Sequence, residues 1–361
     1  RRESKSVLVR FGGKVNMVED NGWLIPQYEG ERVVRAVPYD VAVVGYQDGL
    51  TNTLRLWDAE IPPEEELNYP TISDRRRVED LTSILYPDDS NYEGRLLRLK
   101  QEYFFVSAGV NAIVKAHLKV YPSLKNFHEK NVIQLNDTHP VLVIPELMRI
   151  LVDEYDFEWE DAWDITRKTC AYTNHTILSE ALEKWPVSTM QSLLPRIYQI
   201  IEEINRRFIG FVKKESNHND ELLNRVMIIK DGQVHMAHLA IAGSFSVNGV
   251  AKLHTEILKN QEMKDFNELY PTKFNNKTNG ITFRRWLMHS NPELSAFITE
   301  LIGDSWKKDA DELEKLLDFK ADKEVLQKLL SIKKEKKIQL KNYLMEKQSL
   351  EIDENSIYDI Q

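Results

Sequence analysis

VIQLNDTHP, residues 132–140, predicts a strand, a polar turn and the start of a helix. Residues 132–135 have strand character, and Pro140 opens the apolar-periodic segment VLVIPELMRILVDE. Open α/β sheets bind ligands at the carboxyl ends of their strands, so the turn's carboxylate, hydroxyl and imidazole are candidate ligand contacts. A structural role stays open, because Asp137 or Thr138 is also suited to capping the following helix.

The next segments repeat this alternation. EWEDAWDITRKT (158–169) predicts a helix and CAYT (170–173) a strand, which completes a βαβ crossover and implies a parallel, doubly wound sheet. A lone histidine is usually a packed or surface residue, but His175 follows a strand of this sheet, which favours a ligand contact. Residues 234–259 predict a strand and then the helix VNGVAKLHTEILK, with residues 244–249 as a turn.

The flanking regions differ in character. Residues 5–57 carry β-branched and aromatic runs broken by Gly and Pro, which predicts a β-rich meander before an α/β region at 80–278. Helices are expected at about 73–87, 95–120 and in two stretches of 187–226, and the part after residue 279 is mainly helical. The lysine-rich run 333–337 is typical of a solvated helix face, with a basic patch as the alternative.

Composition limits the possible functions. With 48 basic and 57 acidic residues the net charge is −9, which disfavours nucleic acid as a partner. No run of 18 apolar residues and no signal-like start supports membrane insertion or export. The single cysteine, Cys170, excludes an internal disulfide, fits a reducing cytoplasm and is expected to be a small buried hydrophobe. The beginning, RRESKSVLV, resembles the interior of a longer chain.

No short motif supplies a mechanism by itself. The sequence has no phosphate-cradling glycine loop, no metal-ligand cluster and no identifiable serine or cysteine nucleophile system. Asp137 with a second carboxylate would fit a hydrolase, but sequence does not show the separation of roughly 5–10 Å that such a pair needs.

Five segments nevertheless occur in an informative order: VIQLNDTHP, IPELMRILVD, KTCAYTNHT, MAHLAIAGSFSVNGVAKLHTEI and NKTNGIT. Together they resemble the α-glucan phosphorylases, the glycogen, starch and maltodextrin enzymes, from about residue 7 to the last residue. The resemblance implies the middle segment of a longer enzyme with the two-domain glycosyltransferase B (GT-B) architecture. Residues 1–278 would be part of its N-terminal, Rossmann-like domain, and residues 279–361 the helical start of its cofactor domain.

The resemblance also implies an activity. Phosphorylases use inorganic phosphate to release terminal α-1,4-linked glucose from a glucan as glucose 1-phosphate, with pyridoxal 5'-phosphate as cofactor. The cofactor lysine and the phosphate-binding cluster are expected beyond Gln361, so this segment alone is expected to be inactive, and the complete enzyme is expected to be a homodimer. A non-catalytic carbohydrate-binding module derived from this scaffold remains the alternative, whereas the motifs disfavour a nucleotide-sugar transferase of the same architecture.

The family's site residues are carried over by matching motifs. His175 and Asn279 would contact the 6-hydroxyl of the transferred glucosyl unit, and Val250 would lie with Asn248 at the cleft floor. The remaining expected substrate contacts are on the acceptor side (Asp137, His139), at the gate loop (Asp89, Ser90), behind it (Arg98), and in the flexible wall ILSEALEKWP (Glu183).

Several positions depart from the family pattern. Lys115 and Ala116 stand where nucleotide-activated relatives carry paired arginines, and one lysine does not reproduce the bidentate fork of arginine, so AMP activation is not expected. Glu202 replaces an aromatic of a remote glycogen site while Asn205 is kept, so maltodextrin is expected as a substrate at least as much as glycogen. Phe283 replaces a proline at the crossover between the two domains.

Overall fold

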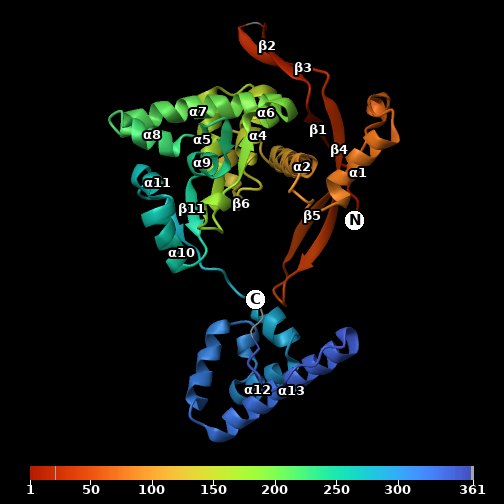
Figure 1. Cartoon of the computed structure of the whole chain (residues 1–361), viewed down its shortest axis with the longest axis vertical. Coiled ribbons are helices and arrows are strands. Elements are labelled where there is room, and N and C mark those ends of the chain that lie inside the picture. The colour runs from red at the N-terminus through yellow and green to blue at the C-terminus, as the bar shows by residue number, and fades with distance from the viewer. Residues whose placement is uncertain (21, 359–361) are drawn as a thin grey trace. The chain divides into compact units, whose positions relative to one another are not determined.

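The computed structural model describes residues 1–20 and 22–358, and the chain separates into two compact units, residues 1–279 and 280–361 (Figure 1). Each unit is described by itself. The first unit contains all the strands of the described residues and is a mixed α/β structure; the second is helical.

The centre of the first unit is a four-stranded, all-parallel sheet of order β12-β11-β7-β6. Its strands are β6 (Ile133–Asn136), β7 (Cys170–Thr173), β11 (Ser246–Gly249) and β12 (Phe274–Asn276). The parallel βαβ crossover predicted from the sequence is therefore confirmed. Cys170 is fully buried in β7, and burial raises the pKa of its thiol to about 12, so it is the inert hydrophobe that was expected.

The sheet is held by an apolar core. Leu135, Tyr172 and Val247 are fully buried in adjacent strands, and Ile144 and Leu147 of the helix after β6 belong to the same core. Each such side chain contributes roughly 1.5–3 kcal/mol on burial. The helices that follow β6 are α4 (Val143–Arg149), its π-helical continuation η2 (Ile150–Glu154) and α5 (Trp159–Thr169). Helix α4 starts three residues after the predicted start at Pro140.

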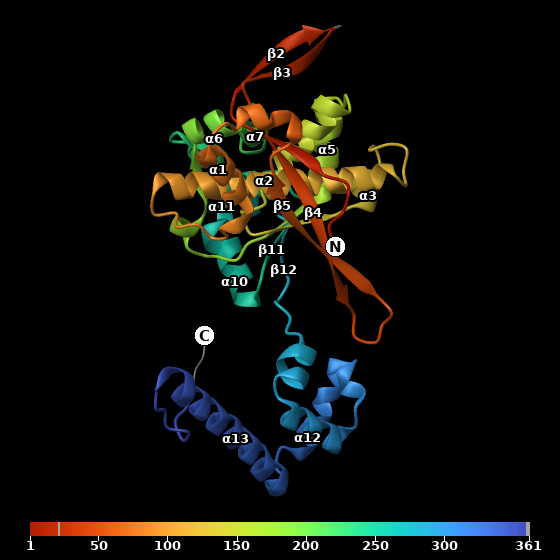
Figure 2. The same ribbon diagram turned by 90° about the vertical axis from the view of Figure 1, so that its right-hand side faces the viewer.

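The predicted β-rich region is confirmed as two antiparallel sheets (Figure 2). One has the order β1-β4-β5, and its strand β1 alternates buried and exposed residues, as expected for a half-buried sheet. The other is a hairpin of β2 and β3. The strands are β1 (Val7–Phe11), β2 (Lys14–Asp20), β3 (Trp23–Glu29), β4 (Arg32–Val44) and β5 (Thr51–Glu60).

Two helices lie beside the β1-β4-β5 sheet. Helix α1 (Ile72–Ser83) begins at a capping box in which Thr71 and Asp74 satisfy each other's backbone N–H groups, and it ends four residues before Pro87. Helix α2 (Tyr92–Leu118) begins at Asn91, whose side chain accepts from Gly94 N. Both helices were predicted. The remaining helical segments here are η1 (Pro63–Asn68) and α3 (Phe127–Lys130).

Residues 187–226 form helices around a polar break, as predicted. They are α6 (Val187–Leu193), α7 (Pro195–Glu215) and α8 (Asp220–Val226), preceded by the turn η3 (Ser179–Ala181). A small sheet of order β8-β10-β9 adjoins them, built from β8 (Lys184–Pro186), β9 (Ile229–Lys230) and β10 (Gln233–His235).

The prediction for residues 234–259 was wrong in its boundaries. The apolar run expected to be a strand is helix α9 (Met236–Ala242), and the residues expected to turn and start a helix form β11, where Val247 lies between Tyr172 and Phe274. A short buried helix and a strand buried on both faces are both continuous apolar runs, so periodicity does not separate them. The later helical elements are α10 (Lys252–Ile257), η4 (Leu258–Glu262) and α11 (Lys264–Leu269).

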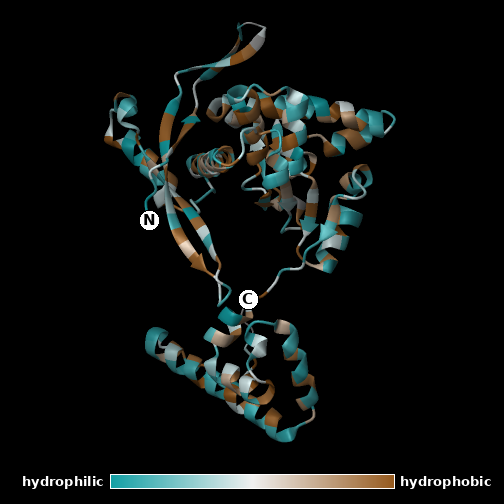
Figure 3. Ribbon diagram, turned by 180° about the vertical axis from the view of Figure 1, so that it is seen from behind, coloured by the Kyte–Doolittle hydropathy of each residue, from teal (hydrophilic) through white to brown (hydrophobic). Residues whose placement is uncertain are grey.

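The second unit has its own small core. Trp306 is fully buried, its indole N–H donates to Thr299 Oγ1, and its ring lies 6.0 Å from that of Phe283, the residue that replaces a proline. The helical segments are η5 (Arg284–His289), α12 (Pro292–Ile302), η6 (Ser305–Lys307), η7 (Ala310–Phe319) and α13 (Lys323–Gln348). The lysine run lies in the largely hydrophilic helix α13, of which only Ile332 is buried (Figure 3). The predicted solvated face holds for Lys333 and Lys334, which are exposed, whereas Lys336 and Lys337 are partly buried.

Candidate functional site

The four parallel strands end at one edge of the sheet, and each is followed by a residue predicted from the sequence. Asp137 follows β6, His175 follows β7, Val250 follows β11 and Asn279 follows β12. Because all four strands run in the same direction, their carboxyl ends meet there. The structure thus gathers at one edge residues that lie up to 142 positions apart in the chain.

The turn after β6 has an unusual backbone. Asp137 has φ = 73°, in the left-handed region that non-glycine residues rarely adopt, and its N–H donates to Thr173 O across the sheet at 3.0 Å. Its carboxylate accepts from Thr138 N at 2.6 Å. Neither residue caps α4, whose N-cap position Leu142 has no side-chain cap bond, so the capping alternative is wrong.

His175 is held by the neighbouring strand. Its ring is exposed, and its Nε2 lies 2.6 Å from the amide oxygen of Asn136, the last residue of β6. The preceding Asn174 is fully buried; its backbone N–H donates to Asn248 O at 2.9 Å and its side chain donates to the Tyr172 hydroxyl at 3.1 Å. The histidine therefore rests on a fixed backbone with one ring nitrogen engaged.

Side-chain hydrogen bonds join three strands on the approach to this edge. Gln134 of β6 donates to the Thr173 hydroxyl of β7, which donates to the amide oxygen of Asn248 in β11, both at 2.8 Å. Such a ladder fixes the relative positions of the strand ends.

The ends of β11 and β12 are joined through the backbone. Asn279 N donates to Val250 O at 3.0 Å, and Val250 N donates to Nδ1 of His254 at 3.0 Å. Burial lowers the pKa of His254, which keeps the ring neutral and Nδ1 free to accept. Sequence reasoning missed His254, although a histidine four residues after Val250 at the start of a helix was a usable signal.

The predicted gate residues form a second cluster around Arg98 of α2. Its guanidinium lies 2.9 Å from Asp89 Oδ2, 3.4 Å from Glu102 Oε1 and 3.7 Å from Glu183 Oε2. The structure therefore brings together Asp89, Arg98 and Glu183. Ser90 stays apart: it is exposed, and its N–H donates to Asp88.

Glu102 is the member of this cluster that sequence reasoning missed. Its side chain and that of Glu183 are 7% and 11% exposed, and one oxygen of each is buried without a hydrogen-bond partner among the described residues. Burial, and then the nearby Glu183 carboxylate, raise the pKa of Glu102 well above its ordinary value. The two acids thus lie against one guanidinium in a poorly exposed site.

A cavity of about 650 Å³ adjoins the Arg98 cluster. Asp89, Arg98 and Glu102 line it together with His139 from the turn after β6. This volume is within the usual range for small-molecule sites. The apolar part of the wall includes Phe105, Val106, Val110, Ile113, Ile133 and Val143.

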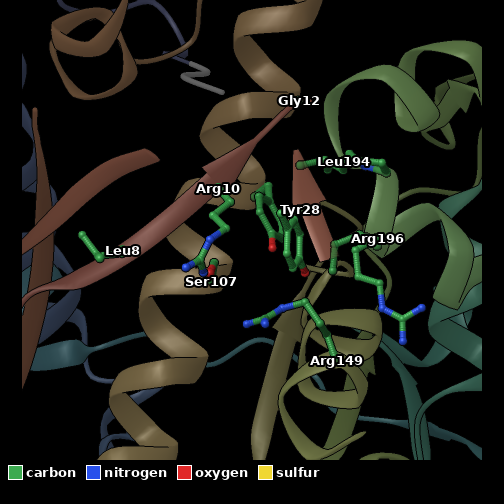
Figure 4. Close-up of a pocket in the computed structure, with 11 residues that line it drawn as sticks. Leu8, Arg10, Gly12, Tyr28, Ser107, Arg149, Leu194 and Arg196 are labelled. Atoms are coloured by element: carbon green, nitrogen blue, oxygen red, sulfur yellow. The ribbon is translucent and has the colours of Figure 1, made fainter. Parts of the chain in front are cut away.

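Two other features are structural. Asn205 accepts from the N–H groups of Ile228 and Ile229 at 3.1 Å and so fastens α7 to the residues after α8. The pocket in Figure 4 has a volume of about 30 Å³, room for one water, and its Arg149 and Arg196 are each engaged by two oxygens of a carboxylate.

Some classes of site are absent from residues 1–20 and 22–358. No three side chains of His, Cys, Asp or Glu gather there in a way that could hold a metal ion. Over the same residues, no helix has the length and apolar character needed to cross a membrane.

The chain is thus an α/β protein whose parallel sheet carries polar residues at its carboxyl edge, the edge at which open α/β sheets bind ligands. Residues 1–361 match the family model described as carbohydrate phosphorylase, and the chain belongs to this family. It is 47% identical over its whole length to the glycogen phosphorylase of Bacillus subtilis, covering 45% of that protein.

Other relatives give the same result. The chain is 45% identical to the muscle form of glycogen phosphorylase from Bos taurus, with 98% of the chain and 44% of that protein covered. It is 41% identical to the Synechocystis glycogen phosphorylase, with 100% and 44% covered. The chain thus spans less than half the length of these relatives.

Proposed function

We propose that this chain supplies part of the sugar site of an α-glucan phosphorylase, which releases terminal α-1,4-linked glucose from glycogen or maltodextrin as glucose 1-phosphate. The observation that carries this proposal is the meeting of Asp137, His175, Val250 and Asn279 at one sheet edge, each fixed by a hydrogen bond from or to a neighbouring strand or loop. Names of the relatives support the same reaction.

The residues would act by binding and positioning. His175 and Asn279 would hydrogen-bond the 6-hydroxyl of the transferred glucosyl unit, with the neutral His254 keeping Val250 in place at the floor. His139, Asp89 and Arg98 would line the path of the acceptor glucan, because they share one cavity. Glu183, in the segment 177–186 that would form the flexible wall of the site, would hold Arg98 by its negative charge. Ser90 would contact substrate only after the gate loop rearranges.

The larger architecture is proposed on the same basis. Residues 1–278 would be part of the N-terminal domain of a two-domain GT-B enzyme, and residues 279–361 the start of its cofactor domain. The complete enzyme would be a cytoplasmic homodimer that is not activated by AMP, given Lys115 and Ala116 near the end of α2.

Pyridoxal phosphate is the family's cofactor, and it supplies acid–base chemistry through its phosphate when bound. The described residues at the sheet edge do not fit it. Lys277, the lysine nearest the strand ends in sequence, donates to Asn275 Oδ1 at 2.6 Å and to Asn276 O. The buried Lys273 donates to Ile241 O at 2.7 Å. We derive no step through this cofactor, and we propose that residues 1–361 alone are inactive.

Phosphorolysis of maltoheptaose by the complete protein tests the function. We expect glucose 1-phosphate to form in a phosphate-dependent reaction. Glucan binding by the complete protein without glucose 1-phosphate release would instead favour the carbohydrate-binding module, and release of free glucose would indicate hydrolysis.

A further inference from the structure

A second large cavity lies away from the strand ends. Helices α1 and α2 lie beside the β1-β4-β5 sheet (Figures 1 and 2). Residues of these helices and of β1 and β4 line the cavity, whose volume is about 560 Å³. Four basic side chains line it: Arg32, Arg76, Arg77 and Lys100. The proposed phosphorylase reaction uses none of them.

The charges around this cavity are not balanced. Arg32 is paired with Asp74, 3.0 Å away, and Asp74 also serves the α1 capping box. Among residues 1–20 and 22–358, however, no carboxylate lies within 4 Å of the Arg76, Arg77 or Lys100 side-chain nitrogens. Two further acids, Asp80 and Glu93, line the cavity without pairing with these cations.

Lys100 is the most sheltered of these cations. Burial lowers its pKa, and the positive charges of Arg77 and Arg32 lower it further against an opposing effect of Glu93. Bringing like charges together in a partly buried cavity costs free energy, which a bound anion would recover.

Most of the remaining wall is apolar. Phe11, Val34, Val78, Leu81, Leu96 and Leu97 line the same cavity. A cavity of this volume is much larger than a phosphate ion, so it also has room for an organic group attached to the phosphate. An organic phosphate monoester fits both the cationic side chains and the apolar wall. Its phosphate dianion would contact the cations, and its organic group would pack against the apolar wall.

We propose that the cavity between α1, α2 and the β1-β4-β5 sheet binds an organic phosphate monoester through Arg76, Arg77 and Lys100. This site is separate from the strand-end site and does not depend on the proposed phosphorylase activity. It uses the middle of α1 and the first turns of α2, whereas Lys115 lies in the last turn of α2.

Isothermal titration of the 361-residue chain with phenyl phosphate at pH 7 tests the proposal. Two control ligands separate the contributions: inorganic phosphate has the anion without an organic group, and benzyl alcohol has an aromatic group without an anion. We expect phenyl phosphate to bind at least about tenfold more tightly than either, since charge-assisted hydrogen bonds and apolar burial both contribute. Equal affinity for inorganic phosphate, or no binding of phenyl phosphate at millimolar concentration, overturns the proposal.

Matched variants locate the site. Arg77→Met and Lys100→Met should each weaken phenyl phosphate binding about tenfold or more, whereas Arg75→Met, a change in the same arginine run but outside the lining, should not. Equal effects at Arg75 and Arg77 would mean a general surface charge effect and overturn the assignment. Arg77 is exposed, so its variant stays informative if Lys100→Met does not fold. Thermal melts check folding.

A second measurement does not rely on substitution. The ¹³C signal of dimethylated Lys100, titrated with pH, should show a pKa that rises when phenyl phosphate is added, because a nearby anion favours the charged amine. An unchanged pKa with saturating phenyl phosphate would show that Lys100 does not face the ligand.

Discussion

The Nε2 atom of His175 lies 2.6 Å from the Oδ1 atom of Asn136, so the last residue of β6 holds the imidazole that follows β7. His175, which we propose to contact the sugar, is thus held by the adjacent strand and not by its own loop. Asn136 and His175, at the ends of neighbouring strands, therefore act together although they are 39 positions apart in the sequence.

The first prediction follows from that contact. Asn136→Ala in the complete enzyme should lower kcat/KM by about tenfold, since an imidazole that loses a hydrogen bond of about 1–2 kcal/mol is less well oriented. Val132→Ala, just before the same strand, is the matched control, because its side chain is exposed. Full activity of Asn136→Ala beside an impaired His175→Ala variant would show that the ring is positioned by something else.

The second prediction concerns Arg98. Replacing it with Met should lower the free energy of unfolding of the chain by about 2–4 kcal/mol, because two poorly exposed carboxylates lose their cation. Arg206→Met removes an exposed pair with Glu203 and should cost no more than about 1 kcal/mol. Urea unfolding at pH 7 measures both. Equal effects would mean that the Arg98 cluster is no more than a surface ion network.

The third prediction is a pH dependence from His238. Burial lowers its pKa to about 4, and its Nδ1 lies 2.9 Å from Met227 O. The unfolded chain binds the proton near pH 6.5 and the folded chain only near 4, so stability should fall between those values by roughly 3 kcal/mol as the pH drops. His238→Gln should reduce this slope, whereas the exposed His218→Gln should keep it. Denaturant unfolding at several pH values measures the slope; equal slopes for wild type and His238→Gln would contradict the assignment.

The fourth prediction concerns regulation. AMP should leave the phosphorolysis rate of the complete enzyme unchanged, because Lys115 followed by Ala116 does not offer the paired guanidinium groups that grip a phosphate. Rates on maltoheptaose with and without AMP decide this, and an activation of several-fold would refute it.

Much of the fold was accessible from sequence because its signals are local. The polar residues after β6 and β7 and the β-branched runs before residue 60 each mark an element within a few residues. The segment of α9 was predicted as a strand and that of β11 as a turn and helix start, because both are largely buried segments. The strand is identified only by the pairing of Val247 with Tyr172 and Phe274.

The site was predictable only in part, for a related reason. Residues next to a strand end or within a long motif were found, but Glu102 lies inside a helix that reads as ordinary amphipathic sequence. Its importance comes from Glu183, 81 positions later, which shares Arg98 with it. Ion pairs between residues that are distant in the sequence produce no periodic pattern from which they could be predicted.

The most direct test of the sugar site uses a donor that lacks one hydroxyl. In the complete enzyme, run in the synthetic direction, kcat/KM is measured for glucose 1-phosphate and for its 6-deoxy analogue with wild type, His175→Ala and Asn279→Ala. We predict that wild type prefers glucose 1-phosphate by about 10–1,000-fold, from about 1–4 kcal/mol of hydrogen bonding, and that each variant loses much of this preference. Variants that lose activity but keep the full wild-type preference would contradict the assignment of both residues to the 6-hydroxyl.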